Sequence, residues 1–157
     1  MEKNSSKAFR LIAQNKKAGF NYFIEETYQA GIELFGVEVK SLRGGRCNIA
    51  DSYVEIKNSE AFIVNMHISP YEFANYQKKD PLRKRRLLLH KSQIRKLIGA
   101  VTRDGMSVVP TKIYFLGSLI KIDIALAKGK KMHDKRHDMA KKDMKRESEK
   151  EFKIKNL

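Results

Sequence analysis

The last 30 residues of the chain, 128–157, contain too few apolar side chains to form a core of their own. They hold 12 Lys and Arg and 6 Asp and Glu, against seven apolar residues. Burying so little apolar surface does not offset a chain entropy cost of about 1–2 kcal/mol per residue. Any packed domain must therefore lie within residues 1–127. We expect the tail to be disordered alone and helical against a partner, because many of its residues favour helix.

The charge of the whole chain favours a polyanionic partner. Its 157 residues suit one domain, and its 33 Lys and Arg against 18 Asp and Glu give a net charge of +15. A charge of this size makes nucleic acid the leading candidate. An acidic membrane surface is the competing interpretation. It would require a wide apolar helix face or a lipidation site, and neither is visible.

The cysteine content and the absence of long apolar runs indicate the compartment. Cys47 is the only cysteine, so it can build neither a disulfide framework nor a four-thiolate zinc site. We expect it to be a small buried residue rather than a nucleophile. Residues 1–7 lack the apolar region of a signal peptide, and no run reaches the roughly 18 apolar residues of a membrane span. We therefore expect a cytoplasmic, reduced protein with no membrane partner.

Most of residues 1–127 have the pattern of short β-strands, with apolar residues alternating at a period of two. The predicted strands are FNYFIEETY (20–28), YVEIK (53–57), AFIVNM (61–66), RRLLLH (85–90), TKIYFL (111–116) and LIKIDIALA (119–127). The second and third form a hairpin around residues 58–60, and the last two form another around residues 117–118. In the final strand, the isoleucines and Leu126 should face the core.

Two short helices interrupt these strands. One has apolar residues at i, i+3, i+4 and i+7, with Ser92 placed to cap its start and Gly105 to end it. The other covers about residues 34–43 and stops at a Gly-Gly pair. Short strands with few helices and no βαβ pattern predict a mainly β fold. We expect a small OB-like antiparallel β-barrel over residues 1–127, with flanking short helices and a basic C-terminal tail.

The segment EVKSLRGGR (38–46) is the most suggestive part of the core. On a helix, Glu38 would lie at the edge of the apolar stripe, while Lys40 and Arg43 would project away from it. Arg46 follows a glycine turn, where backbone can approach a phosphate closely. A solvated amphipathic helix explains the same spacing. Glu38 could hold an arginine in place or accept hydrogen bonds from a base or ribose.

A second basic segment is PLRKRRLLLHK (81–91). In a strand, alternate side chains point to opposite faces, so at most half of its cations can meet one ligand surface. Edge strands use such charges against aggregation, but we favour phosphate contact for four consecutive cations. The predicted contacts are Arg83, Lys84, Arg85 and Arg86, together with Lys16 and Lys17 of the QNKKAG stretch.

Neither a catalytic nor a metal site is evident in the sequence. His133 and His137 would share a helix face, but the HExxH signature and a third ligand are missing, so we expect no metal. No nucleophile–base pair, P-loop or zinc-deaminase pattern stands out. Nothing favours an enzyme or a cofactor.

The tail opens with LAKGKKMHDKRHD (126–138). Gly129 should break the last strand and provide a hinge, and His133 could stack on a base. By composition alone this is a generic basic tail. Its cations are Lys128, Lys130, Lys131, Lys135 and Arg136.

Taken together, these segments resemble the SsrA-binding protein (SmpB) family. The resemblance runs in order through IAQNKKAGFNYFIEETYQAGIEL (12–34), GVEVKSLRGGR (36–46), HISPYE (67–72), DPLRKRRLLLHKSQI (80–94), VVPTKIYF (108–115) and LAKGKKMHDKR (126–136). Gly19, Gln29 and Arg86 are small departures that remove no residue type on which the family's role depends. Residues 137–157 match only in being basic.

The resemblance implies an OB-like barrel that binds the tRNA-like domain of transfer-messenger RNA (tmRNA). By motif match, Asn15, Glu38 and Leu89 would belong to the binding surface or its support. Lys40, Arg43 and Arg46 are additions based on charge. The implied role is delivery of tmRNA to stalled ribosomes for trans-translation, which rescues the ribosome and tags the unfinished peptide for degradation.

The resemblance also implies partners for the tail. The tail would become helical in the empty mRNA channel and meet 16S rRNA at the decoding centre of the small subunit, through Lys131, His133, Asp134, Lys135 and Arg136. The elongation factor that carries aminoacyl-tRNA would join in complex with tmRNA, and we expect the protein to be a monomer. Composition and strand pattern also fit a ribosomal or initiation-type OB protein with a basic extension. An enzyme acting on RNA is the second alternative.

Overall fold

The computed structural model describes residues 8–73 and 79–155. Its main feature is a seven-stranded antiparallel sheet in the order β1-β8-β9-β2-β7-β5-β4. The strands of this sheet are β1 (Phe9–Gln14), β2 (Tyr22–Ile32), β4 (Tyr53–Lys57), β5 (Glu60–Val64), β7 (Arg85–Leu88), β8 (Ser107–Leu116) and β9 (Leu119–Gly129). A small second sheet pairs β3 (Cys47–Asn48) with β6 (His67–Ile68). The helices are α1 (Lys16–Asn21), α2 (Gly36–Arg43), α3 (Lys91–Asp104) and α4 (Met132–Lys155).

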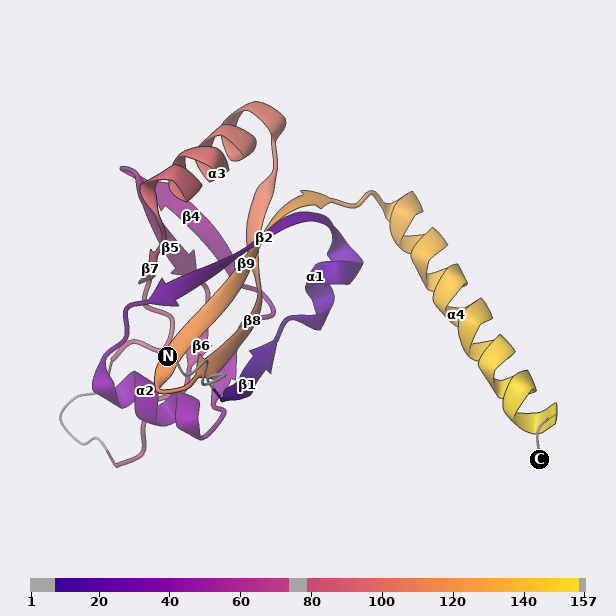
Figure 1. Ribbon diagram of the computed structural model, residues 1–157, viewed down its shortest axis with the longest axis horizontal. Coiled ribbons are helices and arrows are strands. Elements are labelled where there is room, and N and C mark those ends of the chain that lie inside the picture. The colour runs from indigo at the N-terminus through magenta and orange to yellow at the C-terminus, as the bar shows by residue number, and fades with distance from the viewer. Residues whose placement is uncertain (1–7, 74–78, 156–157) are drawn as a thin grey trace, which may run out of the picture.

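The main sheet curls on itself (Figure 1). Strand β4 at one edge contacts β8, which is next to the other edge. The hydrogen-bonded order of the described strands remains open between β1 and β4, so closure into a barrel is not demonstrated. The predicted mainly β, antiparallel fold with flanking helices is confirmed at this coarser level.

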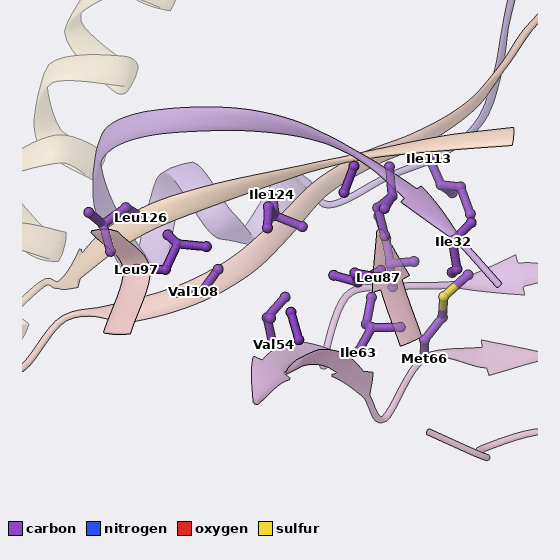
Figure 2. Close-up of a cluster of buried hydrophobic side chains, with 14 of the residues drawn as sticks. Ile32, Val54, Ile63, Met66, Leu87, Leu97, Val108, Ile113, Ile124 and Leu126 are labelled. Carbon is purple, nitrogen blue, oxygen red and sulfur yellow. The ribbon is translucent and has the colours of Figure 1, made fainter. Parts of the chain in front are cut away.

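The core lies inside the curled sheet (Figure 2). Ile122 and Ile124 have no exposed surface, which confirms the predicted inward face of β9. Burying one such side chain contributes about 1.5–3 kcal/mol. Leu97 of α3 closes one end of this core, and Figure 2 shows it beside Val108 and Leu126.

Both predicted hairpins and both predicted helices are present. The β4–β5 turn has positive φ angles at Asn58 and Ser59, the conformation of a tight hairpin. Helix α3 begins one residue before the predicted cap at Ser92. The side chain of Gln93 accepts a hydrogen bond from the N–H of His90 at 3.1 Å, which satisfies this helix end. Gly105, at φ 63°, ends α3 as predicted.

The last strand is longer than the sequence pattern predicts. Lys128 and Gly129 still belong to β9 and lie opposite Phe23 and Tyr22 of β2. The first residues outside the sheet are therefore Lys130 and those after it. Helix α4 then projects away from the sheet (Figure 1). No helix of the described residues is long and apolar enough to cross a membrane.

Candidate nucleic-acid interface

A buried ion pair joins the two basic segments that the sequence singles out. Glu38 of α2 is 4% exposed, and Arg85 of β7 is fully buried. Arg85 Nε donates to Glu38 Oε2 at 2.6 Å, and Arg83 donates to the other carboxylate oxygen. The N–H of Phe35 also donates to that oxygen, at 2.9 Å, so the carboxylate fixes the start of α2 as well.

The remaining donors of Arg85 are also used inside the protein. Its Nη1 donates to the carbonyl of Met66 at 2.7 Å, and its Nη2 donates to that of Pro81 at 3.1 Å. Arg85 thus ties together α2, β7 and the loops on either side of β6. This contradicts the predicted RNA contact of Arg85, because its guanidinium has no surface to offer. Glu38 likewise holds arginines in place instead of facing a ligand.

The environment of Glu38 favours its charged form. Burial raises the pKa of its carboxyl, but hydrogen bonds from Arg83, the Phe35 N–H and Arg85 outweigh that effect. The net pKa therefore lies below its ordinary value of 4.5. Stabilisation by this carboxylate is complete at neutral pH and is lost as the carboxyl takes up a proton in acid.

We predict that the free energy of unfolding falls more steeply below pH 4.5 in the native chain than in Glu38→Gln. The unfolded chain takes up the Glu38 proton at a higher pH than the folded chain, so acid favours unfolding. Urea unfolding at several pH values between neutral pH and pH 3 gives the free energy of unfolding of each chain as a function of pH. Parallel curves would assign the acid sensitivity to other carboxylates.

The neighbours of Arg85 follow the alternation expected of a strand. Lys84 points outward and pairs with Glu55 at 2.8 Å. Arg86 is 45% exposed and makes longer contacts with Glu33 and Glu60, at 3.4 and 3.8 Å. Exposed pairs of this kind are weak, so both cations can exchange their carboxylates for phosphate. Arg83 lies over the ring of Phe35, at 4.5 Å from its centroid.

A separate group of cations surrounds α2 and its terminal turn. Lys40, Arg43 and Arg46 are exposed. The Lys40 ammonium lies 5.5 Å from the centroid of the Tyr71 ring, and Arg46 pairs with Glu72 at 3.0 Å. Gly45, at φ 71°, supplies the backbone conformation that ends this helix.

The segment around α1 divides into support and surface. Asn15 is 8% exposed, and its amide donates to the carbonyl of Pro110 at 3.0 Å, which anchors α1 to β8. Its amide oxygen is buried without a partner. Lys16 is exposed, and Lys17 lies 3.9 Å from Asp51 at the surface. Asn15 therefore supports the surface, while the two lysines belong to it.

A groove of about 400 Å³ opens beside Leu89. Strands β2 and β7 pair at two positions, Gly31 with Leu88 and Ile32 with Leu87, and Leu89 follows the end of β7. Leu88 on the groove wall is 49% exposed. Polar and charged side chains, one of them a carboxylate, complete the lining. They are Gln29, Ser59, Glu60, Arg86, His90, Gln93 and Lys121.

This groove combines an apolar wall with cations and amide groups, as single-stranded or looped-out nucleotides require. Arg86 and Leu89 were predicted as site residues, whereas Gln29, His90 and Lys121 were not. Strand alternation gives the outward direction of Gln29 and Lys121, and it is the one sequence signal for them. Nothing in the sequence places them next to β7.

The predicted tail residues occupy three structural settings. Lys128 and Gly129 lie in β9, Lys130 and Lys131 form the link, and the others begin α4. His133 and Arg136 are exposed, and Lys135 is partly exposed. The side chain of Asp134 accepts a hydrogen bond from the Lys131 N–H at 3.3 Å. Asp134 thus helps to start the helix.

Neither a reactive cysteine nor a metal site is supported in the described residues. Burial raises the pKa of the Cys47 thiol to about 12, so the thiol is a poor nucleophile at neutral pH. Within residues 8–73 and 79–155, no three His, Cys, Asp or Glu side chains gather into a group that could hold a metal.

Comparison with known proteins covers both the sheet and the tail. The model of the family described as SmpB protein matches residues 12–154. The chain belongs to the SmpB family. An SsrA-binding protein of Lachnoclostridium phytofermentans is 56% identical over 153 residues, which cover 98% of this chain and 99% of the relative. The SsrA-binding protein of Caldanaerobacter subterraneus subsp. tengcongensis is 56% identical over 94% of each chain.

A solved structure extends the SmpB likeness to three dimensions. It is described as "tmRNA-SmpB: a journey to the center of the bacterial ribosome". The match has a TM-score of 0.64 and 45% identity, and it covers 76% of this chain and 85% of that one. The family assignment therefore rests on sequence and fold together.

Proposed function

We propose that this chain is an SsrA-binding protein that binds the tRNA-like domain of tmRNA and delivers it to stalled ribosomes for trans-translation. The observation that carries the proposal is 56% identity to an SsrA-binding protein over 98% of the chain. The fold likeness to a chain described with tmRNA and the ribosome supports it. The protein acts by binding, as a cytoplasmic monomer without cofactor or catalysis. The elongation factor that carries aminoacyl-tRNA joins it on tmRNA.

The curled sheet acts as an OB-like RNA-binding domain, and the groove beside Leu89 is its central RNA contact. Leu88 and Leu89 offer apolar contact to a base or ribose, while Lys121 and Arg86 supply charge for a phosphate. Lys40, Arg43 and Arg46 extend the positive surface along α2. The ion pair of Glu38 and Arg85 positions α2 and β7, and so acts on binding indirectly.

We predict that Lys121→Gln weakens tmRNA binding roughly tenfold, about 1.4 kcal/mol. The substitution removes one charged donor from the groove, so the slope of log K against log salt should also fall by about 1. Titration of labelled tmRNA at several salt concentrations measures both quantities. Lys142→Gln, which removes the same charge from the exposed face of α4, is the matched control. Equal losses in the two variants would show that net charge, not the groove, controls binding.

The tail probes whether the mRNA channel is vacant. Helix α4 has 24 residues, many of them charged and exposed, and is about 36 Å long at 1.5 Å per residue. Its exposed cations suit a channel lined with 16S rRNA. An ordering cost upon binding suits a site that exists conditionally, when no message occupies the channel.

Identification of the bound RNA tests the proposal. The tagged full-length protein is used to capture RNA from a bacterial extract at physiological salt, and the captured RNA is sequenced. We expect tmRNA to be strongly enriched over tRNA and over the extract. Recovery of tRNA and rRNA in their extract proportions would contradict the proposal.

A further inference from the structure

A second, smaller cleft lies between helix α3 and the turn of the β4–β5 hairpin. Its volume is about 260 Å³, and we call it the α3 cleft. Ser59 lies in the hairpin turn at φ 59°, and the rest of the lining belongs to α3. Figure 1 shows α3 at the end of the sheet next to β4. The residues that line the α3 cleft are Ser59, Lys91, Ile94, Arg95 and Ile98.

The α3 cleft adjoins the groove beside Leu89. Ser59 and Ile94 line both hollows, so the groove and the cleft meet at these two residues. The groove itself contains Arg86 and Lys121, the cations proposed for phosphate contact. An RNA strand carries a phosphate at every nucleotide, so the backbone of a nucleotide in the groove continues beyond it. The α3 cleft is a neighbouring surface on which that backbone can continue.

The two cations of the α3 cleft are not neutralised by the protein. Lys91 and Arg95 are exposed, and neither takes part in an ion pair among residues 8–73 and 79–155. Lys96 on the same helix differs, because its ammonium pairs with Glu26 at 2.7 Å. The charges of Lys91 and Arg95 are therefore available to an anion.

The placement of these two charges is unfavourable in the absence of an anion. Lys91 and Arg95 are four residues apart in α3, so they are like-charged neighbours on one helix face and repel each other. Helix α3 also has no acidic residue in its first turn, where the helix dipole disfavours a cation such as Lys91. A phosphate between the two side chains relieves both effects. Ile94 and Ile98 beside them offer apolar contact to a ribose.

We propose that the α3 cleft is a phosphate site for the RNA strand that occupies the groove beside Leu89. The proposal rests on the proposed function, because it names where the bound tmRNA continues. Arg95 presents a planar guanidinium that matches a phosphate, and Lys91 adds a second charge. The Ser59 hydroxyl is a further donor at the junction with the groove. An acidic peptide also complements two cations, but the adjoining groove favours RNA.

Titration of labelled tmRNA against Arg95→Gln tests this site. We expect the variant to bind about fivefold more weakly than the native chain, with a slope of log K against log salt lower by about 1. Arg103→Gln is the matched control, because it removes the same side chain from an exposed position of α3 outside the cleft. We expect the control to change the affinity by less than about twofold. Equal losses in the two variants would overturn the proposal.

Thermal unfolding shows whether Arg95 acts through the fold instead. Arg95 is exposed, and its removal relieves the repulsion from Lys91. We therefore expect Arg95→Gln to unfold at the native temperature or slightly above it. A clearly lower unfolding temperature would assign the loss of affinity to folding and would also overturn the proposal.

Ribose footprinting separates failure of this proposal from failure of the proposed function. Hydroxyl-radical cleavage of tmRNA is compared between the native chain and the double variant Lys91→Gln with Arg95→Gln. We expect two adjoining stretches of tmRNA to be protected by the native chain, and one of them to lose protection with the double variant. Unchanged protection would overturn the phosphate site and leave the proposed function intact.

Absence of specific tmRNA protection by the native chain would count against the proposed function. The α3 cleft is then tested with a short unstructured RNA oligonucleotide and with a polyglutamate peptide of equal charge. We expect Arg95→Gln to weaken binding of the oligonucleotide, and Arg103→Gln to leave it nearly unchanged. Oligonucleotide binding that is equal in the native chain and Arg95→Gln would overturn the proposal. So would a loss confined to polyglutamate, which would indicate an acidic peptide as the partner.

Discussion

Glu38→Gln should lower the free energy of unfolding by about 3–5 kcal/mol, because it leaves a buried arginine without its counter-charge. Arg85 is fully buried, and Glu38 is its carboxylate partner at 2.6 Å. The glutamine keeps the size of the side chain but removes the charge. Urea unfolding followed by circular dichroism measures the loss. The sequence leaves two roles open for Glu38, holding an arginine or accepting hydrogen bonds from RNA, and the buried geometry favours the first.

Two further variants test whether burial of the ion pair causes the expected loss of stability. Glu55→Gln breaks the exposed pair with Lys84 and should change stability little, since solvent screens such a pair. The double variant Glu38→Leu with Arg85→Met removes both charges and should recover much of the loss. Native-like stability of Glu38→Gln together with weakened tmRNA binding would return Glu38 to a direct role at the RNA surface.

Removal of residues 132–157 should abolish tagging on stalled ribosomes while leaving tmRNA affinity within a few-fold of native. The buried core of the described chain contains no residue of α4, and the groove is lined by the sheet and α3. The truncated chain therefore keeps its fold and its RNA groove but has nothing to place in the mRNA channel. Tagging is measured in a translation reaction with a truncated message, and affinity by titration of labelled tmRNA.

The affinity of the truncated chain for tmRNA is compared with that of the native chain at two salt concentrations, because deleting the tail removes positive charge as well as structure. A loss of tenfold or more that persists at the higher salt, about 1.4 kcal/mol, would refute the division between a binding sheet and a probing tail. Retained tagging by the truncated chain would refute the role of the tail in probing the mRNA channel.

Local patterns predicted most of the secondary structure. The alternation in β9 and the apolar spacing in α3 depend on near neighbours, so a sequence reveals them. The segment around Arg85 shows the point at which a local pattern no longer predicts the structure. In RRLL (85–88) both pairs of alternate positions contain an apolar residue, so the period does not say whether Arg85 or Arg86 points inward. Its partner Glu38 is 47 residues away, and that contact follows from the tertiary fold.

The groove and the tail junction escaped prediction for a similar reason. The groove lies beside the short pairing of β2 with β7. Gln29 of β2 and Lys121 of β9 line it together with Leu89, which follows β7, so its residues are far apart in the sequence. At the junction, glycine in the sequence indicated a hinge. Pairing of Gly129 with Tyr22 extends the sheet past it. Glycine permits a bend, but the neighbouring strand decides whether one occurs.

The central claim is that this chain recognises tmRNA through its folded sheet. The most direct test compares its dissociation constants for tmRNA and for a tRNA at physiological salt, where non-specific attraction of a +15 chain is screened. We predict at least a hundredfold preference for tmRNA. Equal affinity for the two RNAs would contradict specific recognition and leave a general RNA-binding protein.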